Sequence, residues 1–215
     1  MKNKHYIPSV FSLLIGFSIS VFFVVVLAPS AHAFTLYWVG ADGASTSTAS
    51  NWKMTNPSGC GGGDSISPPN TSDDVVFDAD CDNNAVIDGV FSVNTFTMSS
   101  GYTGTVTQSV AVTTANLSGH SAQAGGTFSG GSAAITIGGN FSITGGTFTS
   151  TSGTLSLAGT YSRTSGTFAH NNGTVTFNGG TSSQTLTGET FYNLTINNTA
   201  PTPGDTDDVD PSAAI

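Results

Sequence analysis

The stretch from Gly125 to Gln184 decides the fold, because it writes one unit of twenty residues three times without a gap. The copies are GGTFSGGSAAITIGGNFSIT (125–144), GGTFTSTSGTLSLAGTYSRT (145–164) and SGTFAHNNGTVTFNGGTSSQ (165–184). Their large apolar residues fall in register: Phe128, Phe148 and Phe168; Ile135, Leu155 and Val175; Ile137, Leu157 and Phe177; Phe141 and Tyr161. A gapless repeat of this length is typical of stacked coils.

Within each unit the apolar residues alternate with hydroxyl residues. Thr136, for example, separates Ile135 from Ile137, and a period of two predicts strands with one face inward. Glycine-containing bends follow at 138–139, 158–159 and 179–180. Copies twenty residues apart should therefore stack about 4.8 Å apart through backbone hydrogen bonds. The sequence predicts an all-β parallel β-helix (β-solenoid) with apolar ladders inside and threonine ladders outside.

Looser coils flank the three copies. We expect Thr105–Thr107 to stack on the Gly-Thr-Phe strands and Ala115–Leu117 to align with Ile135–Ile137. Further strands are expected at 34–39, 73–78, 85–87, 90–93, 96–98, 184–187 and 191–196. About six coils are implied, a rod about 30 Å long at the ordinary spacing between strands.

Three rival architectures fit less well. An antiparallel meander does not require side chains to recur every twenty residues. Calcium-binding nonapeptide rolls need aspartate in each turn, whereas aspartate is absent between Gly89 and Gly204. Leucine-rich repeats need a leucine and asparagine framework that this chain lacks.

Charged residues are scarce. They make up 8% of the chain, with four lysines and arginines and a formal net charge of -9. Binding to phosphates needs basic residues, so nucleic acid is excluded as an expected partner.

The N-terminus has the pattern of an export signal. A basic start is followed by an apolar run at 7–28 and by Ala31-His32-Ala33. This order predicts a signal peptide over 1–33 with cleavage after Ala33. An uncleaved membrane anchor is the alternative, and it would be the chain's contact with a membrane. Both alternatives place the rest of the chain outside the cell, as a secreted or cell-surface protein.

Cys60 and Cys81 are the two cysteines of the chain. In an exported protein such a pair is expected to form a disulfide, and two free buried thiols are the alternative. Two cysteines cannot complete a structural zinc site, which needs four ligands.

Residues 34–89 lack the twenty-residue period and carry both tryptophans. We expect this region to be an irregular N-terminal cap that covers the first coil of repeats spanning 90–198. Trp38 and Trp52 are expected to pack in this cap, and stacking on a sugar ring is the alternative.

Asp78, Asp80 and Asp82 alternate as at the start of a calcium loop. The match fails at Asn83 and Gly89, where that loop needs glycine and glutamate. On a strand the three carboxylates would share one face. A solvated acidic edge is the preferred interpretation, and calcium is the candidate ligand otherwise.

Several motifs together resemble large bacterial secreted and cell-surface proteins built on parallel β-helix repeats, adhesin-like in character. They are Tyr37-Trp38-Val39-Gly40, Asn51-Trp52, Asp73–Asp78, the Gly-Gly-Thr-Phe coils and Phe191–Asn198. The resemblance extends over residues 36–198. It implies an exported β-helix, and such coils serve as stalks, adhesins and polysaccharide-active enzymes.

Catalytic residues are sparse in the repeats. Apart from tyrosine, the ionisable residues between Val90 and Gly204 are His120, Arg163, His170 and Glu189. One glutamate cannot act as both acid and base in glycoside hydrolysis. The two histidines are more than two coils apart and are expected in loops. We therefore expect no catalytic residues and no cofactor.

The expected function is a structural stalk or adhesin-like module that contacts glycans or other surface proteins. The alternative is a carbohydrate-binding or carbohydrate-cleaving module, which would need Trp38, Trp52, Tyr102, Tyr161 and the acids of the cap in one groove. Residues 199–215, rich in proline and aspartate, are expected to be a linker. We expect the chain to be the N-terminal part of a longer protein, with an end-to-end or downstream-domain contact at the last coil.

Overall fold

The computed structural model describes residues 33–114, 121–180, 184–186, 189–198 and 209–211. The chain divides into two compact units, 1–30 and 31–215, and all described residues belong to the second. The signal segment, His120 and Ala115–Leu117 lie outside the described residues. No helix among the described residues has the length and apolarity needed to cross a membrane.

The described residues form β-strands and one short 3-10 helix, η1 (Ala49–Asn51). The strands of the first half are β1 (Thr35–Trp38), β2 (Ala44–Ser45), β3 (Trp52–Lys53), β4 (Asp74–Phe77), β5 (Ala85–Ile87), β6 (Phe91–Val93), β7 (Thr95–Met98), β8 (Thr105–Gln108), β9 (Val112–Thr114) and β10 (Ser121–Gln123). Those of the second half are β11 (Thr127–Ser129), β12 (Ile135–Ile137), β13 (Phe141–Ile143), β14 (Thr147–Thr149), β15 (Thr154–Leu157), β16 (Tyr161–Arg163), β17 (Thr167–Ala169), β18 (Thr174–Phe177), β19 (Gln184–Leu186), β20 (Asn193–Ile196) and β21 (Val209–Pro211).

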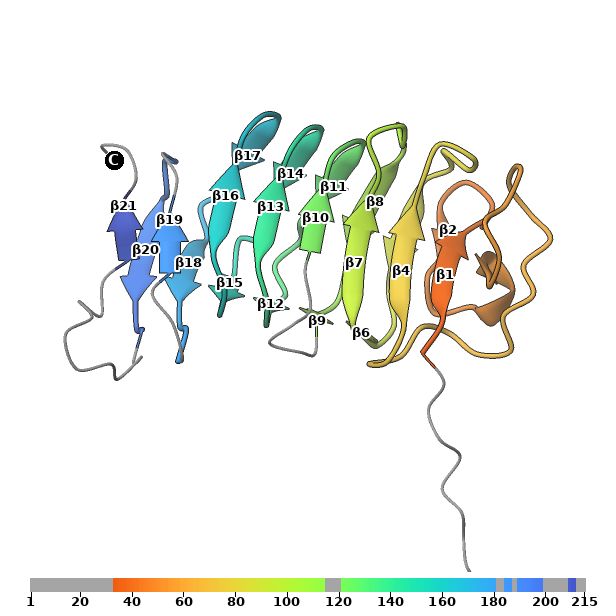
Figure 1. Ribbon diagram of the computed structural model, residues 1–215, viewed down its shortest axis with the longest axis horizontal. Coiled ribbons are helices and arrows are strands. Elements are labelled where there is room, and N and C mark those ends of the chain that lie inside the picture. Colours follow the sequence, from red (N-terminus) through yellow and green to blue (C-terminus); the bar gives the residue numbers. More distant parts are fainter. Residues whose placement is uncertain (1–32, 115–120, 181–183, 187–188, 199–208, 212–215) are drawn as a thin grey trace, which may run out of the picture. The chain divides into compact units, whose positions relative to one another are not determined.

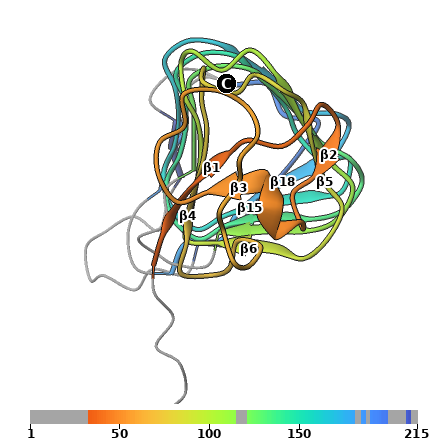
Figure 2. The same ribbon diagram turned by 90° about the vertical axis from the view of Figure 1, so that its right-hand side faces the viewer.

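The strands build a parallel β-solenoid with three sheets along its sides (Figures 1 and 2). Sheet A has the order β16-β13-β10-β7-β4-β1-β3, sheet B β17-β14-β11-β8-β5-β2, and sheet C β20-β18-β15-β12-β9-β6. Each turn contributes one strand to each sheet, and five turns from β4 to β18 are complete. The predicted fold class is therefore confirmed, with partial turns before and after the five.

The register within the three sequence copies is twenty residues. Phe128 pairs with Phe148 and Phe148 with Phe168, so the same side chain recurs at the same place in consecutive turns. The phenyl rings of these pairs lie nearly parallel, with interplanar angles of 10° and 11°. Each strand turns its apolar face inward. Because the strands stack in register, these faces join into one continuous core.

One expected alignment is wrong. Val112–Thr114, rather than Ala115–Leu117, pairs with Ile135–Ile137. Val112 precedes its partner by 23 positions, so the turn between β9 and β12 is three residues longer than the repeat. The strand forms where Val112 and Thr114 can point inward, and both are buried.

Parallel stacking begins further toward the N-terminus than the repeat indicates. β1 already pairs with β4, and β2 with β5, in parallel. The irregular part of the cap is β3, which pairs antiparallel with β1, together with η1 and the connection from 54 to 73. Here the buried carboxylate of Asp73 accepts hydrogen bonds from the backbone N–H groups of Phe34 and Asn70. These elements cover the first edge of sheet A, which would otherwise be open to pairing.

Stacked strands also continue after the third copy. β20 pairs with β18, and it places Leu194 beside Val175 and Ile196 beside Phe177. β19 pairs in parallel with β21, a strand inside the segment expected to be a linker. The twenty-residue pattern does not predict this strand, because Val209 follows its partner Gln184 by 25 positions.

All apolar positions of the repeat that the sequence assigned to the core are buried. These are Phe128, Ile135, Ile137, Phe141, Phe148, Leu155, Leu157, Tyr161, Phe168, Val175 and Phe177. Three glutamines, Gln108, Gln123 and Gln184, are buried among them. Their side chains donate to backbone carbonyls at the corners, as Gln184 does to Leu157 and Gly159, each at 2.8 Å. The carbonyl of Leu157 also accepts from the backbone N–H of Asn178 in the next turn, so the glutamine adds a second donor to it.

Candidate functional site

The two tryptophans, which were expected to pack in the cap, are core residues. Trp38 and Trp52 are both 0% exposed, and they meet edge to face with ring centroids 5.4 Å apart. Both pack on Phe77. The indole N–H groups donate to the carbonyls of Asn83 and Thr46. The sugar-stacking alternative is wrong for both residues, since neither ring reaches the surface.

Tyr102 and Tyr161, the other two aromatic residues of the carbohydrate alternative, are also buried. The hydroxyl of Tyr102 donates to the carbonyl of Asn83 at 2.9 Å, and that of Tyr161 to Oε2 of Glu189 at 3.1 Å. Burial raises the pKa of both phenols, and the charge of Asp82 adds to this at Tyr102 as that of Glu189 does at Tyr161. The four aromatic residues therefore hold the interior together instead of gathering in a groove.

The raised pKa values predict a loss of stability in alkali. In the unfolded chain a tyrosine ionises near pH 10, whereas in the fold both phenols stay protonated well above that pH. Their contribution is complete below about pH 10 and falls as the pH rises further, because only the unfolded chain releases these protons. We expect the thermal midpoint to fall above this pH, and to fall less steeply in a Tyr102→Phe/Tyr161→Phe variant. Parallel curves for the two proteins, measured by circular dichroism, would contradict the assignment.

The three aspartates of the calcium candidate are not arranged as a metal site. β4 ends at Phe77, so Asp78, Asp80 and Asp82 lie in the following turn. They would have shared one face only if they belonged to a strand. Asp78 accepts from the backbone of Asp80, and Asp82 from the backbone of Thr103 at 2.7 Å. Burial raises the pKa of the Asp78 carboxyl. Within the described residues, no group of three or more His, Cys, Asp or Glu is placed to hold a metal ion.

The expected disulfide joins Cys60 to Cys81. It links the loop after β3 to the turn after β4, across a separation of 21 residues. Cys81 is buried and Cys60 is exposed. The bond therefore fixes an irregular, glycine-rich loop to the first turns of the solenoid.

Removing this disulfide should lower stability. A loop of this length, once cross-linked, restricts the unfolded chain by about 3 kcal/mol. We expect the Cys60→Ala/Cys81→Ala variant to unfold at a lower urea concentration and to have a free energy of unfolding that is lower by about that amount. Its far-ultraviolet circular dichroism spectrum should be unchanged. The wild-type protein under reducing conditions is the matched control and should lose the same amount. A variant as stable as the oxidised protein would show that the loop is held by other contacts.

Arg163 and Glu189, the two charged residues of the repeats, form an ion pair at the end of the stack. Arg163 takes the inward position that Ile143 has in the turn before, and its Nε donates to Oε2 of Glu189. This bond raises the pKa of the Arg163 guanidinium. The Glu189 side chain is 7% exposed, and Phe191 beside it packs on Tyr161 and other rings. The ion pair thus lies at the end of the last complete turn, which is formed by β16, β17 and β18.

His170 lies at a corner after β17. Its Nδ1 accepts from the backbone N–H of Asn172, and its ring stacks on Tyr192 with centroids 5.6 Å apart. Asn171 and Asn172 adopt left-handed backbone angles there, with φ of 48° and 58°. The expected loop position of His170 is thus observed, and its contacts are those of a turn.

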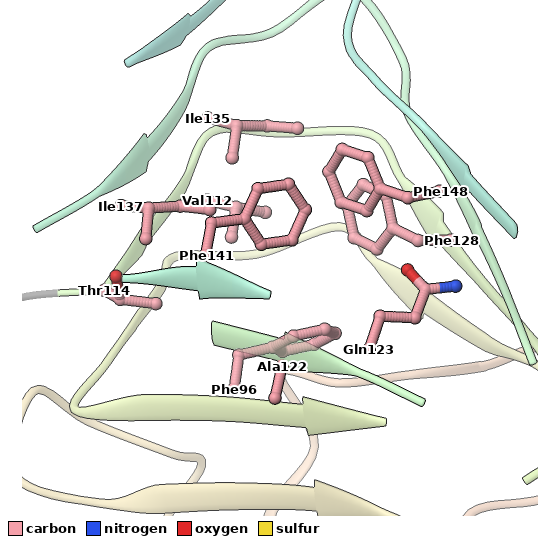
Figure 3. A pocket seen from close by; sticks show the side chains of 10 residues that line it. All are labelled: Phe96, Val112, Thr114, Ala122, Gln123, Phe128, Ile135, Ile137, Phe141 and Phe148. Carbon is pink, nitrogen blue, oxygen red and sulfur yellow. The ribbon is translucent and has the colours of Figure 1, made fainter. Parts of the chain in front are cut away.

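A small cavity of about 20 Å³ lies among the core side chains of the described residues (Figure 3). It is lined by Phe96, Val112, Thr114, Ala122, Gln123, Phe128, Ile135, Ile137, Phe141 and Phe148. Among the described residues, Oε1 of Gln123 has no hydrogen-bond partner. This space lies where the long turn between β9 and β12 meets the regular copies. Its size is about that of one water molecule.

The outer surfaces of the sheets carry rows of hydroxyl groups. In sheet C one row runs through six consecutive strands: Ser92, Thr113, Thr136, Ser156, Thr176 and Thr195. In sheet B two rows run side by side over β8, β11, β14 and β17. The twenty-residue repeat predicts such threonine ladders on the outside. Comparisons with protein families, with characterised proteins and with solved structures find no match to this chain.

Proposed function

We propose that the chain is an exported, non-catalytic module of a bacterial cell surface, a stalk that also offers adhesive faces. The observation that carries the proposal is the combination of an in-register solenoid with uncharged hydroxyl rows on its outside. A stack in which each turn is hydrogen-bonded to the next is stiff along its axis and can hold an attached segment away from a membrane.

The burial of the aromatic residues weighs against the carbohydrate alternative. Trp38, Trp52, Tyr102 and Tyr161 are all within the core, and each has its polar atom bonded inside. Glu189 is engaged by Arg163 and Tyr161. A module that grips sugars needs such groups at its surface.

The proposal is tested by expressing the full chain with a C-terminal epitope tag in a bacterial host. Protease treatment of intact cells should remove the tag. Tagged chain released into the medium should begin near Phe34, and tagged chain that stays on the cells should retain the apolar anchor. The purified chain should release no reducing sugar from a panel of plant and bacterial polysaccharides. A tag protected inside intact cells would refute the surface location, and hydrolysis of any polysaccharide would refute the non-catalytic role.

A further inference from the structure

The outer face of sheet B is a two-dimensional array of hydroxyl groups. Its residues point away from the core on β8, β11, β14 and β17, and all are half-buried or exposed. One row is Thr105, Thr127, Thr147 and Thr167, and the other is Thr107, Ser129, Thr149 and Ala169. Seven of these eight positions are threonine or serine, so the array is nearly complete.

The array is regular because the backbone and the core beneath it are regular. Gly126, Gly146 and Gly166 enter the three last strands with φ of 60°, 64° and 70°, so the corners have one conformation. Inside the sheet Phe128, Phe148 and Phe168 stack with interplanar angles of 10° and 11°. The phenyl side chains therefore keep one orientation from turn to turn. Figure 1 shows β8, β11, β14 and β17 following one another in the same direction.

These features fix two spacings. Neighbouring strands lie about 4.8 Å apart and alternate residues of one strand about 6.6 Å apart, so the hydroxyls occupy a nearly rectangular lattice. No residue of the four strands is charged. Rows of oxygen atoms on the faces of crystalline ice repeat at distances of similar size. Threonine offers such a surface both a hydroxyl group and a methyl group, whereas a charged side chain would keep a shell of liquid water.

We propose that the outer face of sheet B binds ice. The lattice of hydroxyl groups orders water in the positions of the ice surface, and the absence of charge matches an uncharged crystal. Sheet C offers a long single row, but its second row is limited to Thr154, Thr174 and Asn193. The outer row of sheet A includes Tyr37, Val76 and Ala122, which break the pattern of hydroxyls. Sheet B is thus the face on which both spacings are repeated.

The test is partition of the purified chain between a slowly growing ice hemisphere and the remaining liquid. Wild-type protein should be enriched in the ice, and Thr147→Lys, in the middle of the array, should lower its affinity for ice about tenfold or more. The matched control is Ser142→Lys, an outward position on sheet A that receives the same charge. It should partition like the wild type.

Thermal midpoints are measured for both variants to check that they are folded. Similar stability is expected because both positions face outward. Exclusion of the wild type from ice would overturn the proposal, as would equal losses in the two variants. Crystalline cellulose and chitin are tested in parallel as other ordered surfaces. Retention on either one without enrichment in ice would assign the face to a polysaccharide and would also overturn the proposal.

Discussion

Replacing Phe148 by alanine is expected to lower the free energy of unfolding by about 3–5 kcal/mol. The ring is 4% exposed and lies between two turns, with its centroid 4.8 Å from that of Phe128 and 6.1 Å from that of Phe168. It also meets Phe141 edge to face at 4.7 Å. The substitution removes contacts in three consecutive turns and enlarges the cavity that Phe148 already lines.

Urea unfolding followed by circular dichroism measures this loss. The control is Val90→Ala, because Val90 is 88% exposed and its truncation should change stability by about 0.5 kcal/mol or less. Equal midpoints for the two variants would mean that the phenylalanine ladder is not the core of the stack.

Replacing Gly146 by alanine is expected to cost about 2–5 kcal/mol, the sum of two effects. The backbone there has a φ of 64°, which a residue with a Cβ adopts at a cost of about 1–2 kcal/mol. In addition, the new Cβ would lie 2.5 Å from the carbonyl oxygen of Gly126 in the neighbouring turn. Overpacking of this kind typically adds about 1–3 kcal/mol.

Gly43 separates the two effects. It has a similar φ of 72°, but a Cβ added there meets nothing within 4 Å. Gly43→Ala should therefore show the conformational cost alone, and the difference between the two variants, measured by thermal unfolding, reports the close approach of successive turns. If both variants lost the same stability, the turns would not be in contact at this corner.

The sequence predicted the fold because the three copies carry the register directly. In a parallel stack each residue lies on its equivalent in the next turn, so Phe128, Phe148 and Phe168 recur at the period of the structure. Outside the copies the turns vary in length, and the alignment depended on composition alone. Ala115–Leu117 was misplaced for this reason, and β21 was missed.

The candidate site was harder to predict because burial depends on tertiary contacts. The sequence allows Trp38 and Trp52 either to pack in a cap or to form a platform for a sugar. Their packing on each other and on Phe77 distinguishes these two roles. The role of Glu189, by contrast, was not predicted. A signal was present, since Arg163 stands where the copy before has Ile143, and an inward charge needs a partner.

The parallel in-register solenoid is tested most directly by distances between spin labels along the outer row of sheet C. Cysteine is introduced at Ser92 and, in separate variants, at Ser156, Thr176 or Thr195, while the native cysteines remain joined. Three, four and five strand spacings separate these pairs, which predicts Cα separations of about 14, 19 and 24 Å. A series that lengthens by one constant step per turn supports the solenoid. Distances that fail to increase from Ser156 through Thr176 to Thr195 would contradict it.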